Sequence, residues 1–169
     1  LEPGVQLNDG SEEDLQKAFD LYGRFDVDKG VEDIAATIAH LRTLAACSGQ
    51  VGAVGFCLGG LLAYLTSTRT DCDAAVGYYG VSIDQKLDEA GRIGKPLLLH
   101  VAEKDQFVPP EAQKIVADRL ADNAHAILHS YADVDHGFAR AGGQHYDAAA
   151  TKRAHERTLS FFARHLGSS

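Results

Sequence analysis

Residues Val51 to Gly60 read VGAVGFCLGG, an apolar run that leads directly into a G-x-C-x-G-G sequence. The run from Gln50 to Phe56 predicts a buried strand, and the stretch from Leu58 to Ser67 predicts a helix. Glycines two residues before and after Cys57 allow the strand and the helix to pass closely at a sharp turn on strained backbone. This stretch therefore predicts a strand joined to a crossover helix, with a cysteine at the turn.

Short apolar runs and helical stretches alternate along the rest of the chain. Three more strands are predicted, at Ala74 to Tyr79, Pro96 to Val101 and His125 to Tyr131. The other stretches predict a short helix or loop at Asp84 to Gly91 and helices at Pro109 to Ala121 and Tyr146 to Leu166. Alternating strands and helices require crossover connections, so we expect an α/β fold with a mainly parallel sheet and helices on both faces.

Two helices are expected before the first strand. Leu1 to Gly10 is rich in turn formers and predicts an irregular lead-in, and Ser11 gives a helix-capping pattern with the acids that follow it. Apolar residues then recur at helical spacing at Leu15, Phe19 and Tyr22. A second helix, ending near Ser48, is predicted by an apolar stripe of Val31, Ile34, Ile38, Leu41 and Ala45.

The composition limits the class of protein. With 169 residues, 45% of them hydrophobic, the chain can bury one sizeable core, and we expect a single domain over residues 1–169. The 16 Lys and Arg against 24 Asp and Glu give a formal charge of -8, which argues against nucleic acid or a membrane surface as partner. The apolar runs are far shorter than the roughly 20 residues needed to span a bilayer, which predicts a soluble protein.

The cysteines indicate the compartment. There are three, Cys47, Cys57 and Cys72, an odd number at wide spacings. This pattern is unlike the disulfide framework of a small secreted protein and is typical of a reducing environment. We therefore expect a cytoplasmic protein.

Three polar residues follow directly after the ends of predicted strands. They are Cys57, Asp105 and His136. The carboxyl ends of parallel strands form the edge at which open α/β sheets place their sites, so the three side chains can converge. In the roles that their chemistry permits, His136 takes up the thiol proton and later activates water, and Asp105 orients the imidazole. The N–H of Leu58, at the start of the helix, is the expected donor to the oxyanion of an acyl-transfer intermediate.

Each of these residues also has a plainer interpretation. Cys57 can be a buried cysteine in a tight turn, and Asp105 can cap the following helix or form a turn. His136 is one of eight histidines, most of which are expected to be solvated or packed. Its Asp-His-Gly-Phe setting after an apolar strand favours the catalytic interpretation.

The chain resembles the dienelactone hydrolases, or carboxymethylenebutenolidases, which have the α/β-hydrolase fold. Cysteine in place of serine at the nucleophile position is the most diagnostic feature. The resemblance extends over essentially the whole chain and lies in VGAVGFCLGG (51–60), AVGYYGV (75–81), DQFVP (105–109), HGFAR (136–140) and ERTLSFF (156–162). It implies hydrolysis of dienelactone, an unsaturated lactone with a carboxylate, to maleylacetate in the degradation of chlorinated aromatics, with no cofactor.

The resemblance also assigns residues. It implies that Cys57, Asp105 and His136 are the catalytic triad, and that Arg140 binds the substrate carboxylate. A buried guanidinium suits that task because its planar fork can bind both oxygens, while the plainer interpretation is a surface arginine. Tyr79 and Phe107 match positions near the substrate pocket, and either can equally be a packed aromatic.

One departure concerns the opening strands of the family domain. The strands that precede the first helix in this family carry a glutamate, a second oxyanion amide and another arginine, and none has a counterpart in this sequence. The sequence contains no methionine and begins with Leu1, so we expect it to be the C-terminal portion of the family domain. Cys57 would then lie next to an exposed sheet edge. This leaves a second hypothesis, a non-catalytic or incomplete fragment that needs another chain, and it raises the possibility of self-association.

Two other classes of site are disfavoured. The glycines near Val51 do not have the spacing of a dinucleotide-binding or P-loop motif. His125 and His129 lie in a strand-like run, and the sequence has neither H-E-x-x-H nor paired C-x-x-C, so no metal site is expected.

Overall fold

The computed structural model describes residues 3–8 and 10–167 of the chain. The order of strands and helices follows the pattern expected from the sequence. In chain order the elements are α1 (Glu12–Gly23), α2 (Val27–Thr43), β1 (Gly52–Phe56), α3 (Leu58–Arg69), β2 (Ala74–Tyr78), the 3-10 helix η1 (Ile83–Arg92), β3 (Leu97–Ala102), α4 (Pro110–Leu120), β4 (Ala126–Tyr131) and α5 (Ala148–Leu166).

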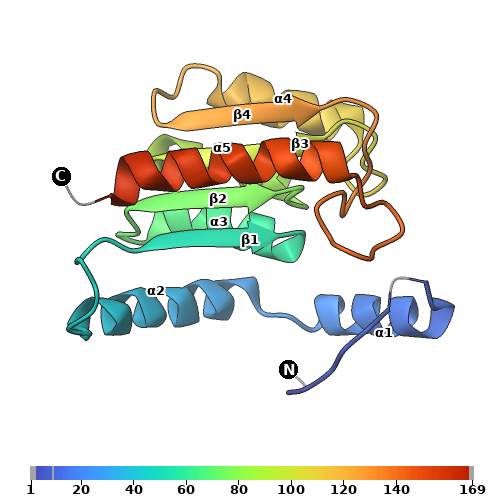
Figure 1. The fold of residues 1–169 in the computed structure, drawn as a ribbon, viewed down its shortest axis with the longest axis horizontal. Coiled ribbons are helices and arrows are strands. Elements are labelled where there is room, and N and C mark those ends of the chain that lie inside the picture. Colours follow the sequence, from blue (N-terminus) through green and yellow to red (C-terminus); the bar gives the residue numbers. More distant parts are fainter. Residues whose placement is uncertain (1–2, 9, 168–169) are drawn as a thin grey trace.

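The four strands form one parallel sheet in the order β1-β2-β3-β4 (Figure 1). Val54 of β1 is in register with Val76 of β2, and Leu99 of β3 with Gly77. Strands β2 and β3 are almost entirely buried, as expected for parallel strands that are covered on both faces. The prediction of a parallel α/β sheet is confirmed.

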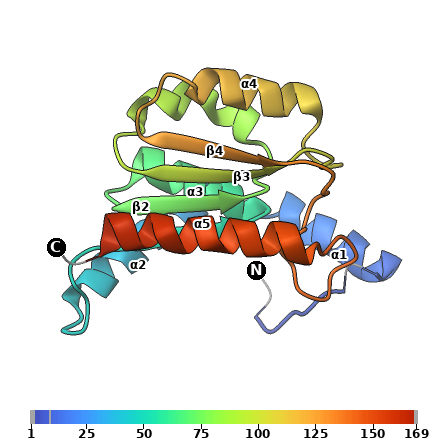
Figure 2. The ribbon, with the colours of Figure 1, turned by 45° about the horizontal axis from the view of Figure 1, so that its top comes forward.

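Helices cover the two faces of this sheet unequally. Helix α5 lies on one face, and helices α3 and α4 and η1 lie on the other, with α2 packed against α3 (Figures 1 and 2). Each face has its own buried core. Tyr64, Leu65 and Leu97 belong to the core on the α3 face, whereas Val76, Phe138 and Phe161 belong to the core under α5.

Helix ends differ from the expected ones where a local interaction ends the helix. Helix α2 ends at Thr43 because Leu44 has extended backbone, so the inclusion of Ala45 in its stripe is wrong. Helix α5 begins at Ala148 rather than Tyr146, because the Asp147 carboxylate accepts a hydrogen bond from the Ala150 N–H at 2.7 Å and caps the helix. The predicted cap at Ser11 is present and accepts from the Asp14 N–H at 3.3 Å.

Two apolar surfaces of the described chain are open to solvent. Helix α1 buries none of its residues, although its apolar residues have helical spacing, and Phe19 is 47% exposed. Strand β1 is an outer strand that pairs with β2 among the described residues, and its Val54 and Phe56 are 51% and 44% exposed. Of the two, helix α1 lies near the carboxyl end of β1, on the side of the molecule where the candidate site is found (Figure 1).

Candidate active site

The turn at Cys57 joins β1 to α3 with strained backbone. Cys57 has φ of 56°, in the region that favours glycine. The conformation is held from both sides, because the Cys57 N–H donates to the Tyr78 carbonyl at 3.0 Å and its carbonyl accepts from the Gly60 N–H at 2.9 Å. The half-buried thiol is thus presented at the carboxyl end of β1.

Glycines make this turn possible, but one of them lies at a different position from the one expected from the sequence. A Cβ on Gly55 would lie 1.9 Å from the Gly59 carbonyl oxygen, so strand and helix approach too closely for any side chain there. The Cβ position of Gly59 is open, whereas a Cβ on Gly60 would lie 2.6 Å from the Gly80 Cα. The second glycine that is sterically required is therefore Gly60 and not Gly59.

Helix α3 begins directly after Cys57, so the positive end of its dipole lies beside the thiol. Leu58 is its first residue, and in the part of the chain that is described its N–H has no hydrogen-bond acceptor. This arrangement places a free N–H donor next to the Cys57 thiol. It can bind a developing negative charge on an oxygen atom.

Asp105 and His136 are brought together by two loops. Asp105 lies in the loop after β3 and His136 in the loop after β4, and His136 Nδ1 and Asp105 Oδ2 are 2.9 Å apart. The Asp105 side chain is only 2% exposed, and its second oxygen accepts from the Phe107 N–H at 2.9 Å. The carboxylate is therefore fixed in orientation before it contacts the imidazole.

The protonation of His136 reflects its neighbours. Burial by itself lowers the pKa of His136, but the hydrogen bonds to Asp105 and Cys57 and the negative charges of both groups outweigh burial and raise the pKa to about 9. His136 is therefore an imidazolium at neutral pH. It interacts with Cys57 on one side and with Asp105 on the other.

Two aromatic rings enclose the His136 imidazole. The ring centroids of Tyr79 and Phe107 lie 5.0 and 4.9 Å from that of His136, both edge-to-face. Tyr79 is buried and has φ of 37°, and burial above all raises the pKa of its hydroxyl, which is therefore neutral at physiological pH. Phe107 is 43% exposed and forms the outer side of the enclosure.

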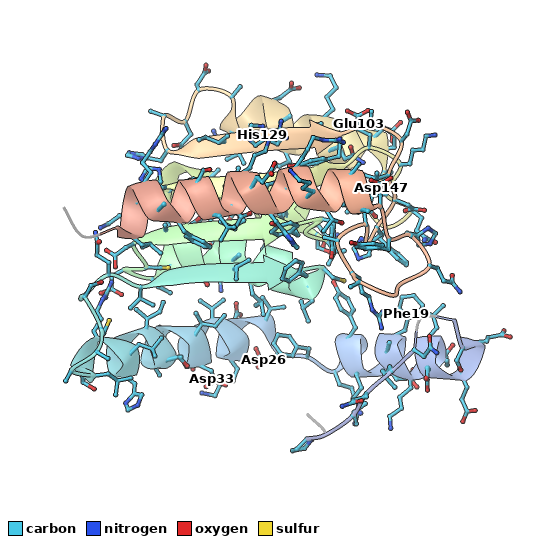
Figure 3. All side chains as sticks on the ribbon, in the orientation of Figure 1. Phe19, Asp26, Asp33, Glu103, His129 and Asp147 are labelled. Carbon is cyan, nitrogen blue, oxygen red and sulfur yellow. The ribbon has the colours of Figure 1, made fainter. Side chains whose placement is uncertain are left out.

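Helix α1 brings one aromatic residue, Phe19, next to the site, which the sequence analysis did not assign there, and its Tyr22 contacts the loop after β2. The Phe19 ring lies 6.2 Å from that of Phe107, and the Tyr22 hydroxyl lies 3.5 Å from the Ser82 Oγ. Figure 3 shows Phe19 on the side of α1 that faces the rest of the molecule. Their helical spacing was visible in the sequence, but it could not show that α1 packs beside the site rather than on the core.

Arg140 is exposed, contrary to the expectation of a buried cation. It lies in the loop between β4 and α5, and its Nη2 donates to the Leu7 carbonyl at 3.1 Å. It remains close enough to the site for its charge to act on the Tyr79 hydroxyl. The structure thus places Arg140 at the border of the site, where its guanidinium also contacts the N-terminal segment.

Among the described residues there is no group of three or more His, Cys, Asp or Glu side chains that could hold a metal ion. No helix in the described ranges is both long enough and apolar enough to cross a bilayer.

The fold and these residues define a class of protein. A parallel sheet with a strained cysteine turn after one strand, and an acid and a histidine after later strands, is the arrangement of the α/β-hydrolases. Comparison with known proteins gives the family. Residues 4–166 match the dienelactone hydrolase family, and the chain belongs to this family.

Individual relatives agree with the family and with the fold. A carboxymethylenebutenolidase-like protein of Azospirillum brasilense is 43% identical over 167 residues, which cover 98% of this chain and 71% of that protein. The carboxymethylenebutenolidase of Pseudomonas putida is 36% identical over 161 residues, 95% of this chain and 68% of its own. The crystal structure of a dienelactone hydrolase-like promiscuous phosphotriesterase from metagenomic libraries has a TM-score of 0.72 at 23% identity, covering 95% of this chain and 70% of that one. The family resemblance inferred from the sequence is confirmed, and the chain is a carboxymethylenebutenolidase-like hydrolase.

Proposed function

We propose that the chain hydrolyses a lactone or ester through an acyl-enzyme on Cys57, and that its substrate is dienelactone, which it converts to maleylacetate. The observation that carries the proposal is the interaction of one imidazole with both a thiol and a buried carboxylate at the carboxyl ends of the strands. Family membership and the names of the relatives support the choice of substrate.

The first half of the reaction transfers the acyl group to sulfur. Cys57 reacts as the thiolate, which is the nucleophilic form, with the thiol proton on the neighbouring His136. The thiolate attacks the lactone carbonyl carbon, and the oxygen anion that forms is stabilised by the Leu58 N–H. The ring C–O bond then breaks, the leaving enolate oxygen takes the proton of His136, and a thioester to Cys57 remains.

The second half regenerates the enzyme. His136 is now neutral and takes a proton from water, whose oxygen attacks the thioester carbonyl. The C–S bond breaks and the electron pair returns to Cys57. The product carries a new carboxylic acid at one end and an internal enol, which becomes the ketone of maleylacetate by tautomerisation, and one lactone and one water have been consumed. Throughout, Asp105 stabilises the cation and holds the imidazole in one orientation.

Substrate binding is assigned to the border of the site. Arg140 offers a planar cation to the substrate carboxylate, and leaves its contact with the Leu7 carbonyl to do so. Tyr79 and Phe107 offer ring surfaces for the flat unsaturated lactone. No cofactor takes part in this mechanism. We also propose, as the sequence predicts, that residues 1–169 form a single domain and that the protein is cytoplasmic.

The test is turnover of dienelactone, together with intact-mass detection of the acyl-enzyme. We expect Cys57→Ala to abolish turnover and to leave substrate binding intact. The matched control is Cys47→Ala, because Cys47 is half-buried near the end of α2 and lies outside the site. Full activity of Cys57→Ala, or a mass adduct on another residue, contradicts the assignment.

A second candidate function is supported by the open edge of β1. Exposed Val54 and Phe56 on an outer strand are the surface expected if a further strand, from this protein or from a second chain, completes the sheet. On this hypothesis the isolated chain folds but needs a partner for activity. Size-exclusion chromatography and a p-nitrophenyl ester assay on the same sample distinguish an active isolated chain from one that needs a partner. A folded, inactive monomer favours the need for a partner.

A further inference from the structure

A groove with a volume of about 370 Å³ runs between β4 and α5. Arg153, Arg157 and Arg164 line it, and we refer to them as the groove arginines. Arg157 follows Arg153 by one helical turn, and Arg164 follows two turns later, so all three project from the same side of α5. His129 of β4 faces them, and Figure 3 shows it beside α5.

The groove arginines lack the ion pairs that other arginines of this acidic protein make. Arg42, Arg69 and Arg92 each contact a carboxylate, at 2.7, 2.6 and 3.8 Å. In the part of the chain that is described, no carboxylate lies within ion-pair distance of a groove arginine. The one carboxylate that lines the groove, Glu156, is paired with Lys152. Positive charge is therefore concentrated here in a chain with a formal charge of -8.

The rest of the groove is built for a ligand that is partly apolar. The Arg157 guanidinium carbon lies 5.2 Å from the centroid of the Tyr131 ring. This cation–π contact holds the arginine side chain against the sheet. Leu98, Ile127 and Phe161 form apolar walls. Burial, and then the charge of Arg157, lower the pKa of His129, so His129 is a neutral imidazole that adds a hydrogen-bonding group without adding charge.

A second copy of the chain is a poor occupant of this groove. Among the described residues β4 is the outer strand on this side, and its Ile127 is 42% exposed, so its backbone edge is open to pairing with the β4 of a second copy. Two-fold pairing would bring two sets of groove arginines near each other, and the carboxylate of Glu156, which lines the groove, is already paired with Lys152. Like charges in contact disfavour that interface, whereas an anion between the arginines satisfies them.

We propose that the groove binds a small anion with two or more carboxylate or phosphate groups. The planar forks of the guanidinium groups fit both kinds of oxyanion, and their spacing along α5 suits a ligand with charges at more than one position. The volume is within the range of small-molecule sites. The site lies on the α5 face of the sheet, apart from the strand ends that carry Cys57 and His136.

The experiment is calorimetric titration of the purified protein with citrate and, separately, with inorganic pyrophosphate, at constant ionic strength. The two arms distinguish a carboxylate ligand from a phosphate ligand. We expect saturable binding of at least one probe, weakened about tenfold or more in the double variant Arg153→Gln with Arg164→Gln, because charge-assisted hydrogen bonds are removed. The control, Arg119→Gln on α4, removes the same kind of charge from the opposite face and leaves the affinity unchanged.

A second readout does not depend on the folding of a variant. We expect the NMR signals of the His129 imidazole in the unaltered protein to shift saturably with the same probe. An anion in the groove contacts that ring or favours its protonation. Absence of binding to both probes at millimolar concentration overturns the proposal. So does binding that leaves the His129 signals unchanged, or that is equally strong in the double variant.

Discussion

Asp135 accepts a hydrogen bond on its Oδ1 from the backbone N–H of Gln106 at 3.0 Å. The same oxygen accepts from the backbone N–H of His136 at 2.6 Å. One carboxylate oxygen thereby joins the loop after β3, which holds Asp105, to the loop after β4, which holds His136. The 2.9 Å contact between Asp105 and His136 depends on the relative position of these two loops.

Asp135→Ala is expected to lower kcat with dienelactone while KM changes little. Loss of the shared acceptor lets the loops separate, and misplacing a catalytic group by about 1 Å can cost roughly 100-fold in rate. Asp135→Asn keeps an acceptor oxygen and should recover much of the rate. Asp133→Asn in the same loop, whose carboxylate pairs with the exposed Lys104, serves as control. Steady-state kinetics of the three variants test this, and equal kcat for Asp135→Ala and the control would contradict it.

The pH dependence of stability is expected to follow His136. Its pKa is about 9 in the folded protein against an ordinary value of 6.5, so the folded state binds this proton more tightly. The resulting stabilisation is complete below pH 6.5 and is lost as the pH rises from 6.5 to 9. It amounts to at most about 3 kcal/mol.

Urea unfolding between pH 6 and pH 10 measures this stabilisation, with His136→Gln as the comparison. The free energy of unfolding should fall more steeply with pH in the unaltered protein than in His136→Gln. Asp105→Asn should show an intermediate slope, because one of the groups that raise the pKa is lost. Parallel curves for the unaltered protein and His136→Gln would rule out this origin.

Gly55→Ala and Gly59→Ala should have opposite effects on stability. The added methyl group at Gly55 would lie 1.9 Å from a backbone oxygen, which neither strand nor helix can avoid without moving, so we expect destabilisation by about 3 kcal/mol or more. At Gly59 the space is open and the residue is helical, so Ala should be neutral or stabilising by about 0.5–1 kcal/mol. Thermal unfolding compares the two directly. Similar melting temperatures would show that the turn does not require this close approach.

Phe107→Ala and Phe19→Ala are expected to raise KM for dienelactone by roughly threefold to tenfold, since an aromatic contact contributes about 0.5–1.5 kcal/mol. Phe107 encloses His136, and Phe19 packs on Phe107 from α1. The effect of the double variant should be smaller than the product of the single effects, because the rings contact each other. Leu159→Ala, an apolar residue on α5 that is 69% exposed, controls for loss of apolar surface. Strictly multiplicative effects would mean that α1 acts independently of the site.

The order and type of the main elements could be predicted because they depend on local patterns. A run such as Leu97 to Ala102 is apolar and short, and such a run between helical stretches has few alternatives to a buried parallel strand. Errors occurred where one interaction ends an element. Asp147 caps α5 and extended backbone at Leu44 ends α2, and these contacts do not alter the periodicity of the neighbouring residues.

The sequence by itself determined the family, the parallel sheet and the three candidate residues Cys57, Asp105 and His136, because each depends on which residues stand next to one another along the chain. Only the tertiary structure decided that Asp135 joins two loops, that α1 lies beside the site, and that the groove arginines gather without carboxylate partners. These features arise from contacts between segments far apart in the chain. Such contacts form where the crossover connections of the sheet bring strand ends and helix faces together, and residue spacing carries no record of them.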